Sequence, residues 1–128
     1  MINVKLATMT INELMHQVHA TAREKGWYQT DRNTLEAHML IVSEVAEATE
    51  EVRSNKPPVY VVREGSPIDD ASQFRSGEKP EGEAVELVDA VIRIADYFGY
   101  RGWDLEKVLQ LKMEYNKTRS FRHGGKKF

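Results

Sequence analysis

Residues 83–98, with the sequence EAVELVDAVIRIADYF, decide the fold. Apolar side chains occupy almost every side of a helical wheel drawn through this stretch, and a helix with so little polar surface is packed on most sides. Its acidic residues Glu86, Asp89 and Asp96 share one side, with Arg93 among them. Burying unpaired carboxylates is costly. The pattern therefore predicts a largely covered helix whose carboxylates point into a cleft or toward a facing helix and bind a cation.

A second apolar helix is predicted over residues 34–53, with Asn33 as its N-cap. At about 100° per residue, Glu44, Glu47 and Glu51 fall on one stripe of this helix, beside a wide apolar arc. Like charges at this spacing weaken a helix by roughly a few tenths of a kcal/mol per pair. We therefore expect something cationic to compensate them.

Two further helices complete the prediction. One begins at the capping box of residues 10–13 and runs to about Lys25, where Gly26 ends it. The other follows Asp104 and continues to about residue 117, while Gly99 is expected to close the helix of residues 83–98. The fold class that follows is all-α, a four-helix bundle.

Residues 54–82 connect the second and third helices and hold all four prolines. Connections of this length are uncommon in compact domains and are usually binding loops, lids or disordered segments. Residues 59–62, VYVV, match a short strand, but four residues do not support a sheet. We predict a single domain over residues 1–128, with a core of about 10–117, a long loop and a basic tail over 118–128.

Composition excludes several classes of protein. The chain has 128 residues, 18 Lys+Arg against 20 Asp+Glu, and no cysteine, which excludes disulfides, cysteine metal sites and thiol nucleophiles. No apolar run approaches the roughly 18 residues that a membrane span needs, and residues 1–10 lack a signal-peptide core. The expectation is a cytoplasmic protein with no membrane partner.

The acidic pairs predict a metal site. Glu44 with Glu47, and Glu86 with Asp89, form a four-carboxylate cluster if their two helices lie side by side. Hard oxygen ligands without cysteine or paired histidine favour Mg²⁺, or Mn²⁺ as a substitute, over Zn²⁺. Mg²⁺ of this kind typically works on phosphates. The alternative is two solvated acidic faces, and the presence of both pairs on such apolar helices favours the metal.

Basic residues near the C-terminal end predict contacts to phosphate. Cations neutralise phosphate charge, an asparagine donates an amide, and glycines let backbone N–H groups approach. The competing interpretations are a solvated basic end and a nucleic-acid contact, and the acidic cluster elsewhere favours phosphate. With Arg93 added, the predicted phosphate-binding residues are Arg93, Lys112, Asn116, Arg119, His123 and Lys126.

These motifs resemble a known family. Residues 43–48, SEVAEA, and 86–89, ELVD, look like the ExxE…ExxD signature of MazG-like nucleotide pyrophosphohydrolases. Residues 116–119 and 123–126 look like the ending of the short, single-domain members. The resemblance covers residues 10–126. It departs from the family at Ser43, where many relatives carry a further glutamate, and in the length of the loop.

The resemblance implies a fold and a reaction. The fold is an all-α one that forms a homo-oligomer, a dimer or a tetramer, with active sites where helices of neighbouring subunits meet. The reaction is the Mg²⁺-dependent hydrolysis of a nucleoside triphosphate to the monophosphate and pyrophosphate. Glu47 is the first choice for the catalytic base that activates water and Glu44 the second. The predicted basic residues would hold the outer phosphates.

Two other functions compete with this interpretation. The first is a helical oligomerisation or regulatory module that has lost catalysis, which damage to the acidic motifs would indicate and which the intact motifs disfavour. The second is a di-iron bundle, which needs two ExxH pairs, whereas the chain has only Glu13-x-x-His16. His16 and His19 are expected to be ordinary helix residues. Trp27 and Trp103 are expected to be core anchors rather than surfaces that stack a base.

Overall fold

The computed structural model describes residues 8–119. They form four α-helices, a two-stranded sheet and one short 3-10 helix: α1 (Ile11–Glu24), α2 (Thr34–Arg53), β1 (Val61–Arg63), β2 (Ser66–Ile68), η2 (Ala71–Gln73), α3 (Glu83–Arg101) and α4 (Leu105–Thr118). The prediction of a mainly helical chain is confirmed. None of the helices in these residues has the length and apolarity needed to cross a membrane.

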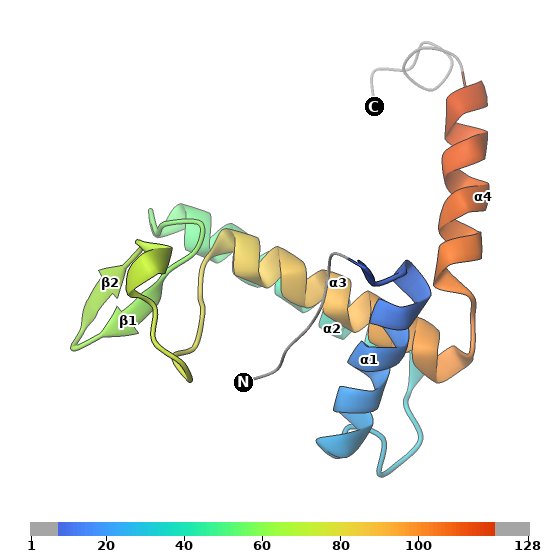
Figure 1. Ribbon diagram of the computed structural model, residues 1–128, viewed down its shortest axis with the longest axis horizontal. Coiled ribbons are helices and arrows are strands. Elements are labelled where there is room, and N and C mark those ends of the chain that lie inside the picture. Colours follow the sequence, from blue (N-terminus) through green and yellow to red (C-terminus); the bar gives the residue numbers. More distant parts are fainter. Residues whose placement is uncertain (1–7, 120–128) are drawn as a thin grey trace.

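An antiparallel pair formed by α2 and α3 is the centre of the molecule (Figure 1). Most of the buried side chains on the two helices are small, which lets the backbones approach. They are Ala37 and Ala48 on α2, and Ala90 and Ala95 on α3. This pairing brings the acidic stripe of α2 next to that of α3.

The helix α1 packs across the second half of α3. Its first turn carries the predicted capping box, in which Thr10 Oγ1 accepts from the Glu13 N–H at 3.1 Å and the Glu13 carboxylate accepts from the Thr10 N–H at 3.2 Å. The contact with α3 depends on Gly99, because a Cβ there would lie 2.6 Å from the Cβ of His19.

The predicted end of α3 at Gly99 is wrong. The helix continues to Arg101 and ends at Gly102, whose φ of 71° is in the left-handed region. Gly99 is a position of close helix approach inside α3, whereas Gly102 provides the C-cap that a left-handed residue commonly forms.

The segment between α2 and α3 contains a sheet that the sequence analysis did not expect. Strands β1 and β2 pair in an antiparallel hairpin, and Tyr60 pairs with Glu81 through backbone bonds of 2.9 and 2.8 Å. Arg63 Nε donates to the Glu78 carboxylate at 2.9 Å, and Arg63 Nη2 donates to the same group at 2.6 Å. These contacts join the first half of the segment to its second half, so the segment is not a structureless loop.

The last helix, α4, projects away from the α2–α3 pair (Figure 1). It is attached at its first turn, where Asn12 Nδ2 donates to Asp104 at 2.8 Å and Asn12 Oδ1 accepts from the Glu106 N–H at 3.0 Å. No side chain of α4 is buried within the chain.

Candidate metal centre and adjoining cavity

Three of the four predicted metal ligands come together between α2 and α3. Carboxylate oxygens of Glu44, Glu86 and Asp89 all lie within 4.8 Å of one another. Glu44 is buried, and the two α3 residues are half-buried. Hard, anionic oxygen donors at this mutual distance suit Mg²⁺ or Mn²⁺.

The fourth predicted ligand, Glu47, lies at the edge of this group. Its side chain is exposed, and it is not among the three residues whose oxygens converge within 4.8 Å. It nevertheless interacts with both Glu44 and Glu86. The arrangement is therefore a tight cluster of three carboxylates with a fourth beside it.

Burial and mutual repulsion perturb the carboxylates of α3. Burial, followed by contacts with Glu44 and Glu47, raises the pKa of Glu86 to about 7. Burial and the nearby charge of Glu44 also raise the pKa of Asp89. Burial is the larger cause for both residues, the neighbouring carboxylates add to it, and a bound cation would oppose both effects.

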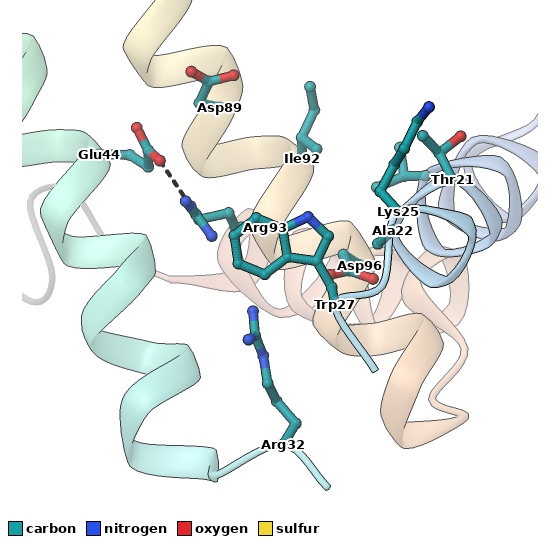
Figure 2. A pocket seen from close by; sticks show the side chains of 11 residues that line it. Thr21, Ala22, Lys25, Trp27, Arg32, Glu44, Asp89, Ile92, Arg93 and Asp96 are labelled. Atoms are coloured by element: carbon teal, nitrogen blue, oxygen red, sulfur yellow. Dashed lines mark hydrogen bonds and ion pairs between the residues drawn. The ribbon is translucent and has the colours of Figure 1, made fainter. Parts of the chain in front are cut away.

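Arg93 supplies part of the expected compensation. Its Nε donates to Glu44 Oε1 at 2.7 Å, and Figure 2 shows this contact as a dashed line. Burial alone would raise the pKa of Glu44, but the bond from Arg93 helps to hold that pKa below its ordinary value. Arg93 was predicted to bind phosphate, and in this structure its partner is the carboxylate.

A cavity of about 300 Å³ opens beside the acidic cluster, between α1 and α3. Glu44 and Asp89 border it, and residues of α1 line its opposite side (Figure 2). Trp27, in the turn after α1, is 48% exposed and lies across this cavity. The guanidinium carbons of Arg32 and Arg93 lie 5.3 and 5.6 Å from the centre of its ring.

Asp96 lies in the wall of this cavity and is held by two donors. His19 Nδ1 donates to Asp96 Oδ1 at 2.9 Å, and the Tyr28 hydroxyl donates to Oδ2 at 2.8 Å. Burial and the bond to Asp96 raise the pKa of Tyr28, so the phenol keeps the proton that it donates. His19 is therefore a residue of α1 that pairs with a buried carboxylate.

Trp27 and Arg32 had no predicted role in the site, whereas Asp96 was predicted to point into a cleft with the other carboxylates of this helix, and it lines the cavity. Trp27 was expected to anchor the core, and it lines a cavity instead. The signal for Asp96 was its position seven residues after Asp89, on the same side of α3. The contribution from α1 and the following turn carried no local signal, because it depends on how α1 packs against α3.

The predicted basic residues of α4 are not brought to the acidic cluster of their own chain. Lys112 and Asn116 are exposed on α4, which projects away from α2 and α3, and Arg119 is exposed as the C-cap of that helix. The charged groups of Lys112 and Arg119 lie 5.1 and 5.8 Å from the ring of Tyr115. His123 and Lys126 lie outside the described residues.

Together these features define a helical protein with a carboxylate cluster beside a cavity lined by an aromatic ring and two arginines. No protein family, curated protein or solved structure was found to match the chain. Its function is therefore argued from the site alone.

Proposed function

We propose that the chain is a Mg²⁺-dependent nucleoside triphosphate pyrophosphohydrolase, which converts a nucleoside triphosphate and water to the monophosphate and pyrophosphate. The observation that carries this proposal is the convergence of Glu44, Glu86 and Asp89 within 4.8 Å, next to a cavity of about 300 Å³. The cluster suits a hard divalent cation, and the cavity is large enough to take part of an organic substrate.

Each carboxylate has a role in this proposal. Glu44, Glu86 and Asp89, with Glu47 at the edge, would hold Mg²⁺. When bound, the metal neutralises phosphate charge and lowers the pKa of a coordinated water. Attack by water would form a bond between its oxygen and the α-phosphorus and would break the bond from that phosphorus to the bridging oxygen, which would leave with pyrophosphate.

The water proton has to go to a group of the protein. Glu47 remains our first choice, because it stands at the edge of the cluster where a carboxylate can act without being fully used as a ligand. Glu44 is the second choice, although its bond to Arg93 lowers its basicity.

Arg93 links the cluster to the cavity. It lines the cavity, holds Glu44 and lies near the Trp27 ring. With Glu44 engaged as a metal ligand, the Arg93 guanidinium would be available to a phosphate oxygen of the substrate. A planar guanidinium is well suited to binding phosphate.

The experiment that tests this function is a panel of nucleoside and deoxynucleoside triphosphates with Mg²⁺, in which pyrophosphate and orthophosphate are measured separately. Pyrophosphate with the nucleoside monophosphate is the expected result. Release of orthophosphate alone would place the cleavage at the outer phosphate and would overturn the mechanism. Chelation of the metal with EDTA is expected to stop the reaction.

A further inference from the structure

Asp96 has hydrogen-bonding capacity beyond the two bonds it makes within the protein. A carboxylate accepts at about four lone-pair positions, and His19 and Tyr28 use one on each oxygen. The side chain lines the cavity and remains 12% exposed. Its two partners fix its orientation, so it offers the cavity a rigid acceptor.

Arg32 offers a donor in the same cavity. Among the described residues, its Nε is the buried side-chain polar atom that has no hydrogen-bond partner. Its backbone N–H donates to the Tyr100 hydroxyl at 3.1 Å, which holds the backbone of the residue. Figure 2 shows its side chain extending toward Trp27. A buried donor without a partner is costly, and a ligand that accepts from it would remove that cost.

The cavity therefore presents an acceptor and a donor next to an aromatic face. That set suits a flat heteroaromatic ring with both donors and acceptors on its edge, since such rings stack on indole and hydrogen-bond at the rim. A phosphate group fits this set poorly, because the Asp96 carboxylate would repel it.

The spacing along α3 connects this end of the cavity to the acidic cluster. Asp89, Arg93 and Asp96 follow one another at intervals of four and three residues on one side of the helix. A rise of 1.5 Å per residue places Asp96 about 10 Å along the axis from Asp89. This span is comparable to that between the α-phosphate and the far edge of the base in an extended nucleotide.

We propose that this cavity binds the base of the nucleotide against Trp27, and that Asp96 selects bases with an exocyclic amino group, namely cytosine, adenine and guanine, over uracil and thymine. The proposal rests on the proposed function for the identity of the ligand as a nucleotide. It adds the class of base, which the acidic cluster does not determine.

The selection follows from hydrogen bonding. Cytosine presents an N4 amino group where uracil presents the O4 carbonyl. The amino group donates to Asp96, whereas uracil in the same position would turn its O4 carbonyl toward the carboxylate, which leaves two acceptors in contact, and would have to shift in the cavity to offer its N3–H instead. A well-placed pair of this kind discriminates by about 10- to 100-fold.

The test measures binding rather than turnover. Deoxycytidine and deoxyuridine monophosphates are titrated into the full chain in EDTA, and the fluorescence of Trp27 is followed in a Trp103→Phe background. Trp103 packs against Tyr97 and Phe98 outside this cavity. Its replacement therefore leaves Trp27 as the single tryptophan that reports on binding. We expect the cytosine nucleotide to bind about 10- to 100-fold more tightly, and equal affinities would overturn the proposal.

Two variants separate selection from stacking. Asp96→Asn is expected to bring the ratio of the two affinities close to one, because an amide both donates and accepts; an unchanged ratio would overturn the role of Asp96. Trp27→Ala, whose affinities are measured by isothermal titration calorimetry because the fluorescent reporter is lost, is expected to weaken both nucleotides by about tenfold or more while keeping their ratio. If Asp96→Asn does not fold, the comparison of the two nucleotides on the unsubstituted site still decides base preference.

The outcomes for base selection and for hydrolysis are distinguishable. Preferential binding of cytosine monophosphate without release of pyrophosphate from any triphosphate would support the base site and defeat the proposed function. Release of pyrophosphate at equal kcat/KM from the cytosine and uracil triphosphates would support the function and defeat the base selection.

Discussion

Asp89→Asn keeps the size of the side chain and removes one negative charge from the acidic cluster. We expect it to lower Mg²⁺-dependent turnover on the order of 100-fold or more, because the loss of one group that takes part in electrostatic stabilisation of a reaction typically lowers kcat by that much. The metal-free protein should melt at the same or a slightly higher temperature, because repulsion with Glu44 is relieved. Turnover with Mg²⁺ and thermal unfolding in EDTA measure the two effects.

The control for this variant is Glu50→Gln, an acid on α2 whose side chain is 67% exposed and outside the cluster. It should change neither turnover nor melting. Near-normal activity in Asp89→Asn would remove Asp89 from the site.

Glu86 should make the stability of the metal-free protein depend on pH. Its pKa is about 7 in the folded chain against an ordinary value of 4.5. Between these values the folded chain keeps a proton that the unfolded chain has released, so the contribution of this residue is fully present below about pH 4.5 and is lost as the pH rises through about 7. We expect the unfolding midpoint in urea with EDTA to fall between about pH 5 and pH 8.

Glu86→Gln should flatten this dependence, because glutamine carries no titrating proton. The difference in slope between the two proteins isolates Glu86 from the other carboxylates. Glu50→Gln is again the matched control and should keep the slope of the unsubstituted chain. A slope that is unchanged in Glu86→Gln would contradict the raised pKa.

At the scale of elements, Gly99→Ala should destabilise α3. Alanine in place of an interior helical glycine ordinarily stabilises by about 1 kcal/mol. Here the added Cβ would lie 2.6 Å from the Cβ of His19, so α1 must shift. Overpacking of this kind costs about 1–3 kcal/mol, which reverses the sign. Urea unfolding measures the free energy, and a more stable variant would contradict the close approach.

The starts of the helices could be predicted because caps are local. The side chains of Thr10, Asn33 and Asp104 each accept from a backbone N–H three residues later, as their sequence context indicates. The continuation of α3 through Gly99 and the hairpin before it could not be predicted in this way. They depend on contacts with segments distant in sequence, such as His19 with Gly99 and Tyr60 with Glu81.

Part of the candidate site could likewise be predicted from the sequence, and part could not. The convergence of Glu44, Glu86 and Asp89 follows from helical periodicity and from two neighbouring helices, both of which the sequence expresses. The contribution of His19 and Trp27 does not follow, because it is set by how α1 lies on α3. Residues from such a third element become visible only once the packing is known.

At the scale of the whole molecule, a homo-oligomer is expected. Many large apolar side chains lie on the surface of the single chain, among them Leu35, Met39 and Val42 on α2, Val88 and Val91 on α3, and Leu111, Met113 and Tyr115 on α4. Apolar surface on this scale marks an interaction site, and obligate interfaces resemble a core cut in half. Sedimentation at micromolar concentration should show a dimer or a tetramer, and a stable, active monomer would contradict this.

The basic tail over residues 118–128 is predicted to hold the outer phosphates of the substrate. Truncation after Lys117 removes Arg119 and the tail, while α4 keeps nearly its whole length. If the tail holds the outer phosphates, kcat/KM should fall by orders of magnitude, since charge-assisted contacts contribute about 1.5–3 kcal/mol each. The melting temperature should change little. Hydrolysis at the full-length rate, with loss of a salt-dependent affinity for DNA or RNA, would support a nucleic-acid contact instead.

The bond between Arg93 and Glu44 has a consequence for whether folding would depend on metal binding. Many small metal-binding domains stay unfolded until their metal binds. Here a balancing charge is part of the same chain and reaches Glu44 when α3 packs against α2. If the cluster binds a divalent cation, we expect folding not to require it, so removal of the metal would stop activity and leave the structure around the site intact.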